Sequence, residues 1–351
     1  MPVKFATLHD IAAHNADTII DVRSPAEFAQ DHVPGAINLP ALSNDQRAEI
    51  GTMYVRDSAF RARKRGAAMV ARNVADHLDG PLRDHDGGWQ PLVYCWRGGQ
   101  RSGSFASILQ QIGWRAETIA GGYQSYRRLV HDYLYEAPLP HRIILLDGNT
   151  GTGKTAVLGH LRDRGIQTID LESLAAHRGS LLGGTDAPQP AQKAFETALA
   201  QAFVACDPSK PVVIEAESSK IGRINLPPSV WSAMCTAPRV MIAASIATRA
   251  AYLAKAYADV STDLTALSGR LQPMRYIRGH AVVDAWQAAL VSGDLQKFAA
   301  SLMETHYDPA YDKARALQAH QLLGQVTAET LDSDGLRRTA DQIAALINRA
   351  E

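Results

Sequence analysis

Tyr94-Cys95-Trp96-Arg97-Gly98-Gly99-Gln100-Arg101-Ser102 has the pattern of a strand end, a glycine loop and a helix start. Glycines allow backbone N–H groups to turn inward around an anion, and a helix N-terminus adds donors and partial positive charge. Such surroundings stabilise a thiolate, so the stretch predicts a nucleophilic cysteine with a lowered pKa. The alternative is a structural cysteine at a strand end, but two arginines and two glycines beside a thiol have no packing purpose.

The residues before this loop predict two further parallel strands. Residues 18–23 form a short apolar run that ends in charge, as in a buried strand whose carboxyl end meets a site. Ser24-Pro25-Ala26-Glu27 then has a cap residue, proline at the first helical position and glutamate two residues later. Residues 31–40 predict a turn and a short strand bounded by prolines.

A basic tract lies between these motifs. Residues 54–74 are predicted to be helical, and only Asp57 appears as a nearby counter-charge. A tract this basic in a neutral protein favours contact with a phosphate backbone, and a solvated helix face is the alternative. The predicted RNA-contacting residues of this tract are Arg61, Arg63, Lys64 and Arg65.

A second anion loop follows a short linker at residues 136–140. The strand predicted over residues 142–147 leads into Gly148-Asn149-Thr150-Gly151-Thr152-Gly153-Lys154-Thr155, which matches G-x-x-x-x-G-K-[ST], and an apolar helix start follows. The loop backbone is expected to bind a diphosphate, with Lys154 on the outer phosphate and Thr155 placed for Mg²⁺. The predicted diphosphate-binding residues are Gly148, Thr150, Gly151, Thr152, Gly153, Lys154 and Thr155.

The remaining chain predicts a parallel, doubly wound sheet. Strands are predicted over residues 166–170, 211–218 and 240–245, alternating with helices. Asp170 and Glu215 end two of them, where P-loop proteins keep groups that orient Mg²⁺ or water. Residues 251–351 have helical spacing and contain three further RNA-contact candidates. Residues 177–180 could face a second anion. Further candidates for Mg²⁺ or for supporting the site are Glu217, His177 and Arg178, and the RNA-contact candidates are Arg270, Arg275 and Arg278.

The composition sets the broad class. The chain has 351 residues, which predicts two or three domains, and its 36 basic and 36 acidic residues leave net charge uninformative. Three cysteines cannot form a disulfide framework in so long a chain, and Cys206 and Cys235 are expected to be packing residues. With no basic-then-apolar leader and no 18-residue apolar run, we expect a soluble, cytoplasmic, monomeric protein with no membrane partner.

The N-terminal motifs resemble the rhodanese domain. Asp-Val-Arg-Ser-Pro-Ala-Glu-Phe at residues 21–28, His-Val-Pro-Gly-Ala-Ile-Asn-Leu-Pro at residues 32–40 and the strand ending in Cys95 occur in the order of that family. The resemblance implies that Cys95 carries sulfur or selenium. The usual sulfurtransferase loop has its arginine five residues after the cysteine, whereas Arg101 lies six after Cys95. The longer loop resembles that of the cell-cycle phosphatases and predicts a larger anion.

Along nearly its whole length the chain resembles the bacterial tRNA 2-selenouridine synthase family, a rhodanese domain fused to a P-loop domain. The cysteine loop, the P-loop, the motif at residues 170–180 and Glu-Ala-Glu-Ser at residues 215–218 are similar to that family's motifs. The resemblance implies a rhodanese-like domain at residues 1–135, the linker at 136–140, a P-loop α/β domain at 141–250 and a helical region at 251–351.

The same resemblance implies a two-step reaction on the wobble 2-thiouridine of tRNA. The sulfur is first geranylated with geranyl diphosphate at the P-loop, because alkylation makes it a better leaving group. Selenium from selenophosphate then replaces it at the cysteine loop, with Cys95 as acceptor and Arg97 and Arg101 balancing charge. The implied partners are the anticodon arm of tRNA and an enzyme that produces selenophosphate.

Three other functions remain open from the residues alone. One is a Cys-x5-Arg phosphatase with a regulatory nucleotide-binding module, although the sequence shows no evident general acid. Another is a small-molecule kinase with Asp170 or Glu215 as base. The third is a non-enzymatic RNA-binding or sulfur-carrier protein whose P-loop only senses nucleotide.

Overall fold

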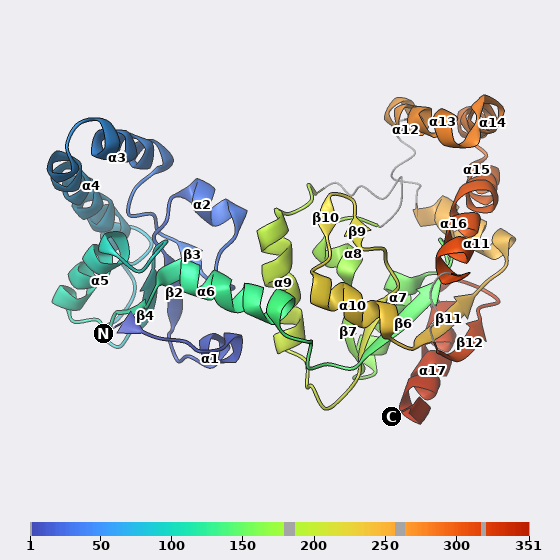
Figure 1. The fold of residues 1–351 in the computed structure, drawn as a ribbon, viewed down its shortest axis with the longest axis horizontal. Helices are drawn as coiled ribbons and strands as arrows, with labels where there is room; N and C mark the ends of the chain where they lie inside the picture. The colour runs from blue at the N-terminus through green and yellow to red at the C-terminus, as the bar shows by residue number, and fades with distance from the viewer. Residues whose placement is uncertain (1, 179–186, 257–263, 317–320, 351) are drawn as a thin grey trace. The chain divides into compact units, whose positions relative to one another are not determined.

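The computed structural model describes residues 2–178, 187–256, 264–316 and 321–350 (Figure 1). The chain forms two compact units. The first comprises Met1–Ala137 with Pro190–Val204, and the second comprises Pro138–Gln189 with Ala205–Glu351. No helix among the described residues is both long and apolar enough to cross a membrane.

The first unit is built on a five-stranded parallel sheet in the order β1-β5-β4-β2-β3. The central strand β4 is buried along its whole length and leads directly to Cys95. The predicted strands are therefore confirmed, and the thiol lies at the carboxyl end of the sheet's middle strand. The strands are β1 (Pro2–Val3), β2 (Thr18–Asp21), β3 (Ile37–Asn38), β4 (Pro91–Tyr94) and β5 (Glu117–Ile119).

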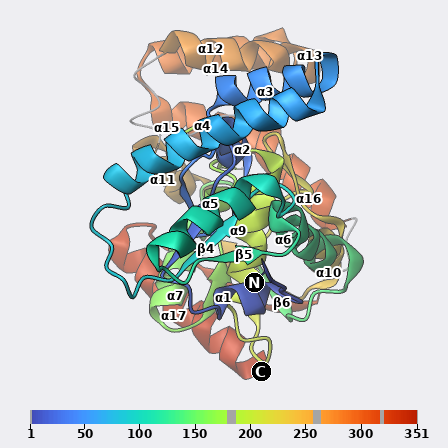
Figure 2. The same ribbon diagram turned by 90° about the vertical axis from the view of Figure 1, so that its left-hand side faces the viewer.

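Two groups of helices pack together in this unit (Figure 2). In one group α4 contacts both α3 and α5, and in the other α1 contacts α6 and α9, which both contact η1. Residues 54–74 are helical as predicted except at a break between two helices: α3 ends at Arg56, and Ser58 caps α4 by accepting a hydrogen bond from Arg61 N. The helices are α1 (Leu8–Ala12), α2 (Pro25–Gln30), α3 (Asn44–Arg56), α4 (Ala59–Asp79), α5 (Gln100–Ile112), α6 (Gly122–His131), the π-helix η1 (Asp132–Glu136) and α9 (Gln192–Val204).

Helix α9 packs with the first unit although its sequence lies inside the second. Thr197 Oγ1 donates to buried Asp31 Oδ2 at 3.0 Å, and the Tyr123 hydroxyl donates to the same oxygen at 2.7 Å. Glu196, also buried, pairs with Arg127 of α6. The expected division into consecutive domains therefore differs from the structure, because a segment far along the chain completes the first unit.

The second unit is built on a five-stranded parallel sheet in the order β12-β11-β6-β8-β7, with a small antiparallel pair β9-β10 beside it. The P-loop strand β6 is central and fully buried. The strands are β6 (Ile143–Gly148), β7 (Gln167–Ile169), β8 (Val212–Glu215), β9 (Lys220–Ile221), β10 (Ile224–Asn225), β11 (Arg239–Ala243) and β12 (Leu322–Thr327).

The edge strand β12 is an exception within the helical region predicted at residues 251–351. Val326 pairs with Ile242 of β11, and α17 then packs its apolar face on the sheet with α7. The sheet therefore continues beyond residue 250. The helices of the unit are α7 (Lys154–Asp163), α8 (Leu171–Leu174), α10 (Pro228–Thr236), α11 (Ile246–Ala256), α12 (Leu264–Leu271), η3 (Gln272–Met274), α13 (Arg275–Arg278), α14 (His280–Val291), α15 (Leu295–Leu302), the π-helix η4 (Met303–Tyr307), α16 (Asp308–Ala316) and α17 (Ser333–Ala350).

A separate helical layer follows β11. Trp286 is fully buried at its centre, among Leu271, Val283 and Phe298, and Leu253 of α11 joins the same cluster. The layer ends in η4 and α16, which bring Tyr307 and Tyr311 to the P-loop cavity. A π-helix is rare and often marks a functional site, and here it directly precedes the helix that covers the P-loop.

Candidate functional site

The cysteine loop places its thiol inside a set of hydrogen-bond donors. Cys95 is only 3% exposed, and its Sγ accepts a hydrogen bond from Ser102 Oγ at 3.2 Å. Burial alone would raise the pKa of the thiol, but the Ser102 hydroxyl, the N–H groups of Ser102 and Gly99 and the charge of Arg101 hold that pKa below its ordinary value. The environment therefore favours the thiolate, as the sequence predicted.

Main-chain N–H groups of α6 donate hydrogen bonds to the carbonyl oxygens of the cysteine loop. Tyr123 N donates to Cys95 O at 2.8 Å, and Gln124 N donates to Trp96 O at 3.0 Å. Gly122 has φ of 58°, and a Cβ on it would lie 2.2 Å from Cys95 O. The Gly121-Gly122 turn is thus needed for this close approach, in agreement with the structural role expected for it.

The two loop arginines differ in placement. Arg101 is half-buried and pairs with Glu27 Oε2 at 3.0 Å, and Arg47 pairs with the same oxygen at 3.0 Å. Arg97 is exposed. The nearby Arg23, which the sequence reasoning did not select, is 1% exposed, bonded to Asp21, with its Cζ 3.9 Å from the Tyr123 ring centroid. Arg23 therefore stabilises the strand ends beneath the loop.

The P-loop has the geometry that its motif predicts. Gly151 and Gly153 have φ of 83° and 77°, and α7 begins at Lys154. A Cβ on Gly151 would lie 2.9 Å from Leu253 Cγ, so the loop passes close to α11 and needs glycine there. Thr152 is buried and its hydroxyl donates to Asn149 O at 2.8 Å, which closes the loop on itself.

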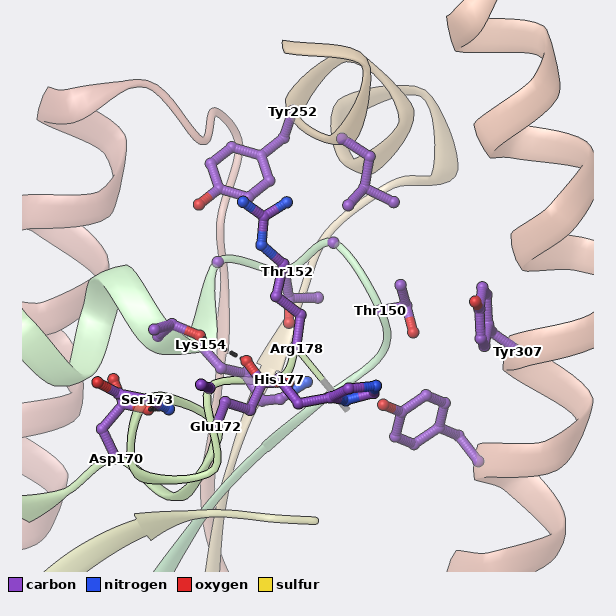
Figure 3. A pocket seen from close by; sticks show the side chains of 16 residues that line it. Thr150, Thr152, Lys154, Asp170, Glu172, Ser173, His177, Arg178, Tyr252 and Tyr307 are labelled. Atoms are coloured by element: carbon purple, nitrogen blue, oxygen red, sulfur yellow. Dashed lines mark hydrogen bonds between the residues drawn. The ribbon is translucent and has the colours of Figure 1, made fainter. Parts of the chain in front are cut away.

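A cavity of about 540 Å³ opens in front of this loop (Figure 3). The predicted residues Asp170, His177 and Arg178 line it together with the P-loop. Figure 3 shows Arg178 reaching toward the ring of Tyr252. The predicted second-anion residues Gly179 and Ser180 lie outside the described residues. The full lining is Thr150, Gly151, Thr152, Gly153, Lys154, Thr155, Asp170, Glu172, Ser173, Ala176, His177, Arg178, Tyr252, Leu253, Tyr307 and Tyr311.

Lys154 is the cationic group of the cavity. Its Nζ donates to Gly148 O at 2.9 Å and lies 5.6 Å from the centroid of the Tyr311 ring. Burial would lower the pKa of this ammonium, but Tyr311, Glu217, Glu172 and Asp147 around it outweigh burial and raise that pKa. Lys154 is therefore charged, and it lines the cavity.

Two arginines that the sequence analysis did not identify donate hydrogen bonds to residues of the P-loop. Arg249 of α11 is 4% exposed, donates to Thr150 O at 3.2 Å and forms a two-pronged ion pair with Asp308. Arg315 of α16 donates to Asn149 Oδ1 at 2.6 Å and pairs with Asp147. An isolated arginine within the apolar run at 246–256 was the available signal for Arg249.

The acidic residues have different roles. Glu215 is 1% exposed and accepts the Glu172 N–H at 2.7 Å, and burial raises its carboxyl pKa well above the ordinary value. Burial and the neighbouring Glu172 raise the pKa of Glu217 to about 8. Asp170 caps α8 by accepting from Ser173 N at 2.8 Å. Glu215 is thus a buried support of the α8 turn and does not line the P-loop cavity.

The donor set fits a Mg²⁺ ion that binds with the substrate. Thr155 Oγ1 and Glu172 Oε2 lie 3.1 Å apart, and both residues line the cavity. No group of three or more His, Cys, Asp or Glu side chains within the described ranges is arranged to hold a metal ion. Mg²⁺ typically keeps several waters and binds through one or two protein oxygens plus substrate phosphates, which this arrangement allows.

The basic residues predicted to contact RNA are partly paired. Arg61 lies 3.3 Å from Asp57, and Arg65 lies 3.0 Å from Glu49, a counter-charge on α3 that the sequence reasoning overlooked. Arg63 and Lys64 are exposed. In the second unit, Arg270 is exposed, Arg275 pairs with Asp284, and Arg278 Nε lies 3.1 Å from His306 Nδ1.

Comparison with known proteins identifies the family. The profile described as "tRNA 2-selenouridine synthase AAA domain" matches residues 141–263, and the profile described as "Rhodanese-like domain" matches residues 6–129. Relatives named tRNA 2-selenouridine synthase include one from Sulfurovum sp., 30% identical over 91% of this chain and 94% of its own length. One from Hahella chejuensis is 30% identical over 84% of each chain.

A relative of the same name from Nitrosomonas europaea is 35% identical over 67% of this chain and 62% of its own length. The alignment thus spans less than two thirds of that protein, whereas it spans nearly all of the Sulfurovum relative. The two profiles match the two anion loops in the order in which the structure presents them. On these matches the chain belongs to the tRNA 2-selenouridine synthase family.

Proposed function

We propose that this chain converts 2-thiouridine at the tRNA wobble position into 2-selenouridine, using geranyl diphosphate and then selenophosphate. The observation that carries the proposal is the presence of two different anion sites in one chain of this family. One is a thiol whose pKa is lowered by surrounding donors, and the other is a P-loop cavity with a charged lysine.

The first step belongs to the P-loop cavity. The sulfur of 2-thiouridine attacks C1 of the geranyl group, the C1–O bond breaks, and diphosphate leaves with the bonding electrons. Lys154 and the loop N–H groups neutralise the charge that develops on the leaving group. A Mg²⁺ ion bound through Thr155 and Glu172 would supply further charge stabilisation to the diphosphate.

The second step belongs to the cysteine loop. Selenophosphate, S-geranyl-2-thiouridine and water give 2-selenouridine, geranylthiol and phosphate, with no change of oxidation state. Selenium in selenophosphate is already at the level of selenide, so forming a perselenide on Cys95 would require an oxidant. We therefore assign to the Cys95 thiolate an attack on phosphorus, which breaks the P–Se bond and leaves phosphocysteine for water to hydrolyse. The selenide that is released adds to C2 of the geranylated base, the C2–S bond breaks, and geranylthiolate leaves and takes up a proton.

Two features of the loop support attack on phosphorus. The six-residue spacing from Cys95 to Arg101 matches the loop length of cysteine phosphatases, which bind a tetrahedral anion. Selenide is also a better leaving group than an alkoxide and departs without a general acid, so the absence of such an acid from the sequence pattern is no obstacle. This assignment departs from the expectation that Cys95 itself carries selenium.

The test uses the purified protein, tRNA containing wobble 2-thiouridine and mass spectrometry of the nucleosides. Both donors together should give 2-selenouridine, and geranyl diphosphate alone should give the S-geranyl nucleoside. Acid-quenched protein should carry phosphate on the Cys95 peptide during turnover. Selenation without geranyl diphosphate would contradict the first step, and selenium on that peptide would contradict attack on phosphorus.

A further inference from the structure

A second cavity, of about 440 Å³, lies next to the P-loop cavity in the second unit. The two cavities share Tyr307 and Tyr311, from η4 and α16. The second cavity continues between the ends of β6, β8 and β11 on one side and α10 and α16 on the other. A ligand held at Lys154 could therefore extend past the two tyrosines without leaving the protein.

The walls of this second cavity are mainly apolar. Carbon-rich side chains come from three directions, with Leu145 and Ala216 from the sheet, Trp231 and Met234 from α10, and two alanines from α16. Met234 is only 2% exposed. Besides the two shared tyrosines, the lining consists of Leu145, Ala216, Trp231, Met234, Cys235, Ala310 and Ala314, with the polar residues Asp147, Glu217, Ser218, Ser219, Arg239 and Arg315.

Asp147, Arg239 and Arg315 form an ion cluster in the lining, whereas Glu217, which also lines the cavity, has a carboxyl pKa that burial and Glu172 raise to about 8. Asp147 accepts from Arg239 at 3.1 Å and from Arg315 at 2.8 Å, and these contacts keep its pKa low despite burial. Arg315 also binds Asn149 Oδ1. A ligand in this cavity therefore meets apolar walls and a neutralised ion cluster, which suits a hydrocarbon better than a polar group.

Tyr311 forms the junction between the two cavities. Lys154 Nζ lies 5.6 Å and Arg315 Cζ 5.4 Å from the centroid of its ring. In a prenyl diphosphate one oxygen separates the first carbon from phosphorus, so a diphosphate at Lys154 places the start of the chain beside this ring. An aromatic ring also packs well against the allylic carbons.

We propose that this second cavity holds the prenyl chain of the diphosphate substrate and sets the chain length that the protein accepts. The inference rests on the proposed function, because it assumes that the P-loop binds a prenyl diphosphate. The cavity volume lies in the usual range for a site that encloses a small apolar ligand. Each buried methylene adds to affinity, so a five-carbon analogue should bind about a thousandfold more weakly than the ten-carbon substrate.

The main test places a larger side chain on α16, where it should occupy part of the cavity. Ala310 and Ala314 are exposed on this helix, so a larger side chain should be tolerated by the fold. Ala314→Trp should weaken binding of geranyl diphosphate about tenfold or more in calorimetry with the full chain. Inorganic diphosphate, which reaches only the P-loop, should bind as before. Ala316→Trp, on the same helix but outside the cavity lining, is the matched control and should change neither affinity.

A second variant works in the opposite direction. Trp231→Ala enlarges the cavity, so farnesyl diphosphate should gain affinity relative to geranyl diphosphate. Cys235 also lines the cavity, and its alkylation by N-ethylmaleimide, followed by peptide mapping, should slow with geranyl diphosphate but not with inorganic diphosphate.

The outcomes separate the two proposals. If the unaltered protein binds geranyl diphosphate no better than inorganic diphosphate, the proposed function fails at its first step. If it binds geranyl diphosphate tightly but neither Ala314→Trp nor Trp231→Ala changes the preference for chain length, the proposed function stands and this inference is overturned. Loss of ATP binding in Ala314→Trp, with geranyl diphosphate binding intact, would assign the cavity to a nucleoside and also overturn it.

Discussion

The cysteine loop and the P-loop share the same order of backbone elements but differ in where they place their charged groups. Each follows the carboxyl end of a central parallel strand, uses glycines in the left-handed region and leads into a helix. In the cysteine loop the reactive thiol points inward to donors, and Arg101 pairs with Glu27 outside. In the P-loop the cation itself points into the cavity.

The support of the two loops differs as well. The cysteine loop is backed by main-chain N–H groups of α6, whereas the P-loop is braced by the side chains of Arg249 and Arg315. Under the proposed function, the cysteine loop supplies a reacting atom, while the P-loop supplies charge and position for a leaving group. Substitutions in the two loops should therefore separate the two steps of the reaction.

The largest effect is expected at the thiol. Cys95→Ser replaces the nucleophile with a hydroxyl that is not ionised near neutral pH, so selenation should fall roughly a thousandfold or more. S-geranyl-2-thiouridine should accumulate, because the P-loop is untouched. Mass spectrometry of tRNA nucleosides measures both products, and full selenation by the serine variant would remove Cys95 from the reaction.

The next largest effect is expected at Lys154. Lys154→Ala removes the charge that meets the outer phosphate, so geranylation should slow by roughly a hundred- to a thousandfold. Selenation of tRNA that already carries the S-geranyl group should be unchanged. Loss of that second step in the alanine variant would mean that the two loops do not act separately.

The bracing of the P-loop can be tested by stability. Arg249→Met leaves Asp308 without its partner, and breaking this largely buried pair should lower the free energy of unfolding by about 3 kcal/mol. Arg249→Met with Asp308→Leu should recover part of the loss, because no unpaired charge remains. Arg337→Ala, which breaks an exposed pair with Asp334, is the control and should cost under about 1 kcal/mol. Equal losses in the two single variants, measured by denaturant unfolding, would contradict the bracing role.

The sequence was sufficient for both loops because each motif combines local signals. Strand, glycines and helix start are adjacent in the chain, so the positions of Cys95 and Lys154 follow from residues within one short stretch. The parallel sheets and the lowered pKa of Cys95 were predicted from these same stretches.

The missed features depend on contacts between distant residues. Arg249 and Arg315 reach the P-loop from about 100 and 166 positions away, and no local pattern indicates such pairing. The strand β12 contains Gly324 and is half exposed, so it lacks the buried apolar run of the other strands. Helix α9 joins the first unit through Glu196 and Thr197, whose partners lie far earlier in the chain.

A smaller effect is expected for the pH dependence of the thiol. The pKa of Cys95 is held below its ordinary value partly by the Ser102 hydroxyl, so the thiolate should persist to lower pH than in a free cysteine. Ser102→Ala removes that donor and should move the midpoint of iodoacetamide alkylation to higher pH. Cys206, whose pKa is raised by burial, serves as the internal control in peptide mapping. An unchanged midpoint would show that the backbone donors alone set the thiolate.

The smallest effect is expected for the basic tract on α4, which neither loop contacts among the interactions described above. Arg63 and Lys64 are exposed and free to meet phosphates, whereas Arg65 is already paired with Glu49, so its contribution to RNA binding should be reduced. Each phosphate contact removed should flatten the dependence of log affinity on log salt by about 0.7 to 0.9. Arg63→Glu with Lys64→Glu should therefore weaken tRNA binding most clearly at low salt, and adding Arg65→Glu should change the slope less than either of the others.

Filter-binding titrations over a range of salt concentrations measure these slopes, while geranyl diphosphate affinity should stay constant. An unchanged slope in the double variant would make the tract an ordinary solvated helix face, and a large further change from Arg65→Glu would mean that its ion pair with Glu49 opens to bind RNA.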